Sequence, residues 1–142
     1  MSGNAGNVVE KVRELIGTHD KLIGTFGMEI KRVEPGFAEL SMVVKEDHLN
    51  AARLCHGATI YALADVAFAL ACNSHGRQAL ALEVSVNYLR PAQVGDTLTA
   101  TAREENLGNT TGLYTILVTN QHGKKVAFLK ATAFRFERSF VD

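Results

Sequence analysis

The sequence of 142 residues predicts an α+β fold in which one long central helix is wrapped by a curved antiparallel sheet. Residues 57–74 form an apolar, Ala-rich run, and the segments after Gly76 alternate between apolar and polar residues with a period of two. A helix that is apolar nearly all round needs cover on most sides, and strands joined by short turns pair antiparallel. We expect residues 1–142 to form a single domain.

The first half of the chain predicts one helix and two strands ahead of the central helix. Apolar residues recur at helical spacing over about residues 6–18. Residues 28–33 and 37–44 are expected to form two strands. Pro35 and Gly36 between them suit the two corners of a tight turn.

Four more strands are expected after the central helix, which gives the order α-β-β-α-β-β-β-β. In the first of them, five apolar residues alternate with smaller or polar ones and predict a long, half-buried strand. These residues are Leu80, Leu82, Val84, Val86 and Tyr88. The other three strands are centred on residues 98–102, 114–118 and 126–136.

Charge and composition argue against several classes of function. The 15 Lys and Arg residues balance 15 Asp and Glu residues, and a net charge of zero argues against a nucleic-acid-binding surface. The first residues lack the basic and apolar regions of a signal peptide, and the charge of Asp65 argues against a membrane span. Cys55 and Cys72 are isolated thiols, so we expect a cytoplasmic protein with no disulfide and no bound metal.

Asp65 is the one charged residue in the central apolar run and the first candidate for chemistry. A buried carboxylate is costly unless it is paired, so such a group is a candidate for acid/base or nucleophilic work. It shares a helix face with Ala58, Tyr61 and Phe68. The alternative is a structural role, in which Asp65 pairs with an arginine or caps a neighbouring loop.

The start of the central helix is the second candidate. Gly57 and Ala58 carry little side chain, so the first backbone N–H groups of the helix could stabilise an oxyanion. Gly57 could equally be a tolerated cap. His56 could act as a base or hold the loop backbone in place, and Asn50 is of a type more often found in turns.

Gly57 and Asp65 cannot serve one carbonyl group from the same chain. Eight residues separate them, which corresponds to about 12 Å along a helix, whereas a base or nucleophile acts over roughly 3 Å. If both are catalytic, two chains must place their helices side by side and antiparallel. In that case the site is shared across a homodimer, with two sites per pair.

Short motifs along the chain occur in the order found in a known family, over about residues 20–136. They are Leu49-Asn50, Cys55-His56-Gly57, Leu63-Ala64-Asp65, Ala71-Cys72-Asn73-Ser74, Tyr88-Leu89-Arg90-Pro91 and Gly95-Asp96-Thr97-Leu98-Thr99-Ala100. In these motifs the chain resembles the hotdog-fold thioesterases of phenylacetate degradation, the PaaI type. The spacing between the His-Gly and Leu-Ala-Asp motifs is the most specific part of the resemblance.

The resemblance implies a hotdog fold, a dimer that usually pairs into a dimer of dimers, and hydrolysis of acyl-coenzyme A thioesters. Asp65 is then the catalytic nucleophile, or the base that acts on water, and Gly57 offers the oxyanion N–H. Asn50 and His56 order the site from the partner chain. The family favours a small, aryl-acetyl acyl group, and we expect no cofactor.

Further residues are expected to contact the substrate. They are Ala58, Tyr61 and Phe68 at the acyl group, and Arg90, Asn109, Thr110 and Thr111 near the phosphates of the coenzyme. The chain departs from the family at Ala58, where a second Gly is usual, and at Ala81, where some relatives have a catalytic Ser.

Three other functions remain as alternatives. Hotdog relatives that hydrate enoyl-CoA use an Asp and a His five positions further on, where this chain has Leu70. A non-catalytic acyl-CoA-binding module would bind the ester without releasing thiol. A purely structural oligomer would neither bind nor hydrolyse it.

Overall fold

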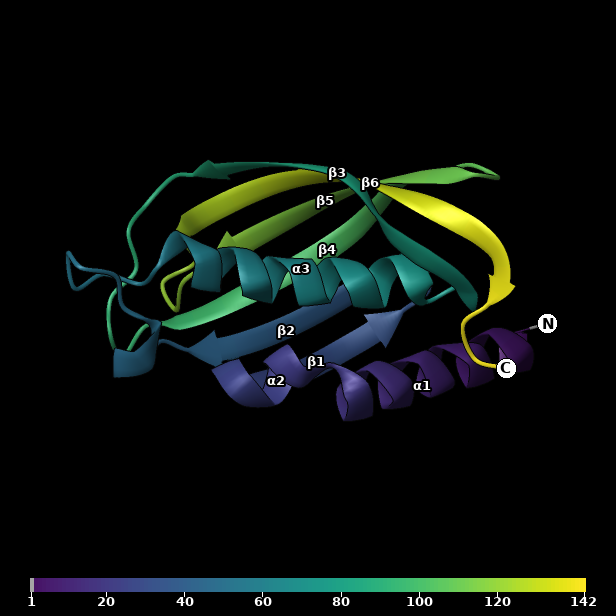
Figure 1. Cartoon of the computed structure of the whole chain (residues 1–142), viewed down its shortest axis with the longest axis horizontal. Helices are drawn as coiled ribbons and strands as arrows, with labels where there is room; N and C mark the ends of the chain where they lie inside the picture. Colours follow the sequence, from purple (N-terminus) through teal and green to yellow (C-terminus); the bar gives the residue numbers. More distant parts are fainter. Residues whose placement is uncertain (1) are drawn as a thin grey trace.

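A six-stranded antiparallel sheet curves around one long helix, α3 (Gly57–Asn73), in the computed structural model, which describes residues 2–142 (Figure 1). The strands lie in the order β1-β2-β4-β5-β6-β3 and every neighbouring pair is antiparallel. They are β1 (Met28–Glu34), β2 (Phe37–Val43), β3 (Arg77–Tyr88), β4 (Thr97–Leu107), β5 (Thr111–Thr119) and β6 (Lys125–Ser139). The other helices are α1 (Ser2–His19), α2 (Lys21–Phe26) and the short 3-10 helix η1 (Glu46–His48). The predicted fold class is confirmed.

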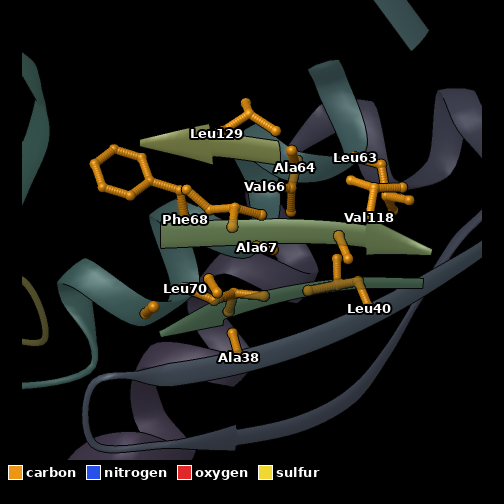
Figure 2. Packing of buried hydrophobic residues seen from close by; sticks show 14 of the residues in the cluster. Ala38, Leu40, Leu63, Ala64, Val66, Ala67, Phe68, Leu70, Val118 and Leu129 are labelled. Carbon is orange, nitrogen blue, oxygen red and sulfur yellow. The ribbon is translucent and has the colours of Figure 1, made fainter. Parts of the chain in front are cut away.

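The core lies between α3 and the inner face of the sheet. Side chains of α3 such as Leu63 and Leu70 meet side chains of β2, β5 and β6, among them Leu40, Val118 and Leu129 (Figure 2). All of these are at most 1% exposed. The many alanines of α3 bring its backbone close to the strands, so an Ala-rich helix can pack inside a curved sheet.

The first of the four later strands differs from its prediction. A β-bulge shifts the register of β3 against β6 between Ala81 and Glu83. Leu80 therefore pairs with the exposed Phe134 on the outer face, whereas Val84 pairs with the buried Ala131 on the inner face. The expectation that the alternating apolar residues share one half-buried face is wrong, because an extra residue reverses the face of every residue on one side of it.

Two short elements near the N-terminal half were not predicted. The carboxylate of Asp20 accepts a hydrogen bond from the Leu22 N–H (3.1 Å) and begins α2. Gly27 ends it in the left-handed region, at φ 73°. The helix η1 follows β2. Among the described residues, no helix is long and apolar enough to cross a membrane.

Candidate active site

One narrow face of α3 is not covered by the sheet and is partly exposed. Its members after Gly57 are Ala58, Tyr61, Asp65 and Ala69, spaced three or four residues apart, while the residues between them are buried. Asp65 is thus on the one partly open face of an otherwise buried helix. The three predicted residues Ala58, Tyr61 and Asp65 do share this face.

Asp65 is a half-buried carboxylate without a partner. No ion pair in residues 2–142 involves it, and the side chains that cap backbone N–H groups there belong to other residues. Burial raises the pKa of Asp65, and the negative charge of Asp20 raises it further. The structural alternative, an arginine partner or a loop cap, therefore finds no support in the described part of the chain.

The N-terminus of α3 offers one free backbone donor. His56 is the N-cap, and its Nδ1 accepts a hydrogen bond from the Ala58 N–H (3.1 Å). The N–H groups of Thr59 and Ile60 donate to the His56 carbonyl. In the described residues, the Gly57 N–H has no such acceptor. Of the first N–H groups that the sequence singled out, Gly57 supplies the one available to a ligand.

Tyr88 explains why the helix begins with glycine. The phenol of Tyr88 donates to the Gly57 carbonyl oxygen (3.0 Å). A Cβ atom at position 57 would lie 3.1 Å from the Cζ atom of the Tyr88 ring. The end of β3 therefore packs on the start of α3, and a side chain at position 57 would push the two apart. The sequence analysis placed Tyr88 in a strand and in a family motif but not against Gly57, because this contact depends on the tertiary fold.

Asn50 and His56 build the loop that leads into α3. The side-chain oxygen of Asn50 accepts hydrogen bonds from the N–H groups of Ala52 (2.9 Å) and Leu54 (3.2 Å). The His56 N–H donates to the carbonyl oxygen of His48 (2.7 Å). Both predicted residues thus have a structural role in this chain, and the side-chain N–H₂ of Asn50 stays available to a ligand.

His48 was not predicted as part of this loop. Its ring is 2% exposed, its Nδ1 accepts from the Lys45 N–H (3.0 Å), and it packs against Phe26 at 5.5 Å between ring centroids. No local pattern indicates this burial, since a histidine within a polar stretch is normally exposed. His48 supports the loop from below and so fixes where His56 and Gly57 lie.

The two cysteines are poor nucleophiles. Burial raises the pKa of Cys55 to about 11, with a further increase from Asp96. Burial and the charge of Asp65 raise the pKa of Cys72 to about 12. Both thiols are therefore protonated near neutral pH. A Cys-His nucleophile is excluded on this ground, although Cys55 directly precedes His56.

A cavity of about 650 Å³ opens beside Asp65 and is lined by α1, α3 and β3. Phe68, predicted to face the acyl group, lines it and is held edge-on against Tyr114 at 5.5 Å between ring centroids. Tyr61 lies near Asp65 and Tyr88, and burial together with these neighbours raises its pKa. In the described residues, no cluster of three or more His, Cys, Asp or Glu side chains could hold a metal ion.

The residues expected near the phosphates do not come together within one chain. The Arg90 N–H donates to Val126 at the start of β6, whereas the carbonyl of Thr110 accepts from the Arg135 N–H further along that strand. Nine residues of strand correspond to about 30 Å. Arg90 therefore lies near the start of α3, and the turn of Asn109, Thr110 and Thr111 at the opposite end of the sheet.

Known proteins share this architecture. The sequence profile of the thioesterase superfamily matches residues 53–127. The chain belongs to this superfamily. A protein of Archaeoglobus fulgidus is 46% identical over 133 residues, which cover 94% of this chain and 86% of that protein. The acyl-coenzyme A thioesterase PaaI of Escherichia coli is 41% identical over 117 residues, covering 82% of this chain and 84% of PaaI.

The solved structures agree with the sequence relatives. The E. coli PaaI protein from the phenylacetic acid degradation operon superposes with a TM-score of 0.91 at 36% identity, covering 94% of this chain and 96% of that one. A Streptococcus mutans protein bound to acetyl-CoA gives 0.76 at 31% identity, covering 79% and 90%. The predicted PaaI-type hotdog thioesterase fold is confirmed, and with it the assignment to a family of thioester-hydrolysing enzymes.

Proposed function

We propose that this chain hydrolyses acyl-coenzyme A thioesters at a site that two copies of the chain build together. Asp65 of one chain acts on a thioester carbonyl whose oxygen is bound by the Gly57 N–H of the partner subunit. One observation carries the proposal: the free donor and the unpaired carboxylate lie on the same side of one continuous helix, about 12 Å apart. Within a single chain, the two groups are too far apart to act on the same carbonyl.

The partly open face of α3 supports a second helix beside it. Ala58 lies one turn before Tyr61 on this face, and a small residue there lets two helices approach closely. In an antiparallel pair related by a two-fold axis near Tyr61, Gly57 of the partner subunit comes next to Asp65. The same axis generates a second site, so each dimer holds two.

The free edge of the sheet supports the same dimer. β3 is the last strand of the sheet, and most of its residues are exposed, including Leu82 at 63%. An exposed edge strand with large apolar residues is a template for pairing. Two β3 strands that pair antiparallel would extend the sheet across both chains. Phe134 and Leu80 on the outer face, both exposed, would then support a dimer of dimers.

The chemistry follows from the charges at the site. Asp65 either attacks the carbonyl carbon or removes a proton from a water molecule that attacks it. In both routes the C–S bond breaks, the hydroxyl of water ends on the acyl carbon, and the remaining proton ends on the coenzyme sulfur. The carbonyl oxygen gains negative charge on the way, and the positive end of the α3 dipole stabilises it through the Gly57 N–H. A raised pKa makes Asp65 a stronger base than an exposed aspartate.

The remaining predicted residues fit this assembly when they come from both chains. Arg90 lies near the start of α3, and an antiparallel partner brings the turn of Asn109, Thr110 and Thr111 toward that end. We assign them to the phosphates of the coenzyme. PaaI of E. coli is named an acyl-coenzyme A thioesterase, and we infer a small, aryl-acetyl type of acyl group here. The buried free thiols of Cys55 and Cys72 support a reducing, cytoplasmic setting.

Thiol release from a panel of aryl- and alkyl-CoA esters tests the activity. Asp65→Asn removes the acid while keeping the shape, so we expect a loss of about 10³-fold in turnover with an intact fold. Gly57→Pro removes the N–H at the first helical position, where proline is tolerated, so this variant should fold but be inactive. Gly57→Ala is the matched control, because it adds the same Cβ atom against Tyr88 but keeps the N–H.

Mixing the two inactive variants tests the sharing of the site. In a mixed dimer of Asp65→Asn and Gly57→Pro, one site carries both changes and the other carries neither. Random exchange of subunits should therefore restore about a quarter of the wild-type activity. A site contained in one chain would give no recovery. Full turnover by Asp65→Asn, or tight binding of the esters by the wild type without thiol release, would contradict the catalytic proposal and favour a binding module.

A further inference from the structure

The cavity beside Asp65 extends well beyond the groups that would act on a carbonyl. On its α3 wall lie Asp65, Ala69 and Cys72, which follow one another on a single helix face toward the C-terminal end of α3. Seven residues of helix correspond to about 10 Å. The cavity of about 650 Å³ falls within the range typical of small-molecule sites.

The other walls come from segments far away in the sequence. Leu15 and Ile16 of α1 lie on one side, and Ala79 of β3 on another. Phe140 lines the cavity next to the end of α3, because its N–H donates to the carbonyl of Gly76 (2.7 Å), just beyond that helix. Figure 1 shows the C-terminal segment and the first turns of α1 meeting beside the last turn of α3.

The distal part of the cavity presents no free polar group of Asn73, the polar residue nearest the end of α3. Its side-chain oxygen accepts from the Ala79 N–H (2.8 Å), and its N–H₂ group donates to the carbonyls of Ala69 (2.9 Å) and Ala79 (3.2 Å). The charged groups lie at the opposite end, where Asp20 and Asp65 line the cavity and both carry negative charge. The lining also contains His19 and Gln78, but an anionic acyl group would be repelled by the two carboxylates at the entrance.

We propose that this cavity binds the acyl group, and that Ala69 and Phe140 determine which acyl groups fit: Ala69 limits the width one turn beyond Asp65, and Phe140 closes the distal end. This rests on the proposed thioesterase function. The acyl groups that fit are uncharged and apolar, with the size of one aromatic ring or a medium alkyl chain. Leu15, Ile16 and Phe140 lie outside residues 53–127, which the superfamily profile matches. Of the two determinants, Ala69 lies within the residues that the profile matches, and Phe140 lies in a segment that flanks them.

Two variants should move the acyl preference in opposite directions. Ala69→Leu keeps a strong helix former on α3 and fills the cavity close to Asp65. Phe140→Ala opens the distal end without touching α3 or the sheet. Phe128→Ala is the matched control, because it makes the same substitution at a phenylalanine of β6 that is 41% exposed and does not line the cavity.

The measurement is kcat/KM for thiol release over a straight-chain series from acetyl-CoA upward, a benzoyl and phenylacetyl series, and succinyl-CoA. For Ala69→Leu we expect the ratio of phenylacetyl- or medium-chain to acetyl-CoA to fall about 10-fold or more. For Phe140→Ala we expect the optimum to move to longer chains. Succinyl-CoA should be a poor substrate throughout, and Phe128→Ala should keep the wild-type profile. The two series show whether the ring or the chain fits better.

Suppose that the wild type is active and that Ala69→Leu and Phe140→Ala fold but keep the wild-type acyl profile. This result would overturn the inference and leave the thioesterase proposal intact. A wild type that releases no thiol from any ester would contradict the thioesterase proposal instead. In that case, calorimetric Kd values of the same esters give the second readout. If Ala69→Leu loses affinity for esters with large acyl groups but not for those with small ones, the result supports the acyl site. If the affinities of Ala69→Leu and the wild type are equal for all esters, the result overturns it. If Ala69→Leu fails to fold, Phe140→Ala, next to the C-terminus, decides the outcome.

Discussion

The two edge strands of the sheet, β1 and β3, differ in how far other elements cover them. At the β1 edge, α1 and α2 pack against the strand, and Arg13 donates from its guanidinium to the Ile30 carbonyl (3.2 Å). Val12 of α1 is fully buried there. At the β3 edge, residues 2–142 supply no such cover, and Leu80 and Leu82 are more than half exposed. The comparison favours the dimer proposed above, in which a second copy covers the edge that lies next to the helix carrying Asp65.

Breaking the uncovered edge should have the largest effect. Leu82→Glu places a charge on β3 without burying it in a single chain, so the fold should persist while the dimer is lost. We expect thiol release to fall by about 100-fold or more, because each site loses the donor from the partner subunit. Light scattering and the thiol assay measure the two effects together. Val43→Glu, at an exposed apolar residue on β2, should keep both. A fully active monomer would contradict the shared site.

Breaking the covered edge should affect stability before assembly. Val12→Ala removes two buried methyl groups between α1 and the core, and we expect the free energy of unfolding to fall by about 2 kcal/mol. Chemical denaturation measures the change, and light scattering should show an unchanged dimer at protein concentrations well above those needed to assemble it. A loss of dimer without a loss of stability would mean that α1 belongs to the interface between chains instead.

Asp20 sharpens the comparison, because it links the covered edge to the site. Burial, and then the charge of Asp20, raises the pKa of Asp65, and in the proposed mechanism only the ionised form is active. Asp20→Asn should therefore lower that pKa and move the acid limb of kcat/KM to lower pH, by less than about one unit. Asparagine caps the Leu22 N–H as aspartate does, so α2 should remain intact. If the acid limb of kcat/KM did not move, the raised pKa of Asp65 would be due to burial alone.

The same raised pKa has a consequence for stability with the opposite sign to that of most aspartates. Folded Asp65 holds its proton at pH values where the unfolded chain has already lost it. Its contribution to stability therefore decreases as the pH rises from the ordinary value to the raised one. Asp65→Asn should remove this dependence, which thermal unfolding at several pH values can measure.

Much of the fold could be predicted from local patterns. The apolar run with one charge gave the central helix, and the period of two gave the later strands. The bulge in β3 could not be predicted, because nothing in the local sequence marks Leu82, between Ala81 and Glu83, as the residue without a partner on β6. The helix α2 could have been found: Asp20 and Gly27 are ordinary start and stop signals around it.

The site was predictable where one residue carries the signal. Asp65 stands out by charge and Gly57 by size, and their spacing along a helix is fixed. The parts that were missed depend on tertiary contacts: Tyr88 lies over Gly57, His48 lies under the loop, and Phe140 reaches the end of α3 from the C-terminal segment. A local pattern holds no information about which distant segment arrives beside it.

The burial of Cys55 and Cys72 bears on how the enzyme can be assayed. Their exposed fractions are 5% and 2%, and their thiols stay protonated at neutral pH. A chromogenic disulfide reagent such as dithiobis(nitrobenzoate) reacts with accessible thiolates. The folded protein should therefore contribute almost no absorbance of its own. The absorbance would then count liberated coenzyme directly, and a slow rise in a substrate-free blank would report unfolding.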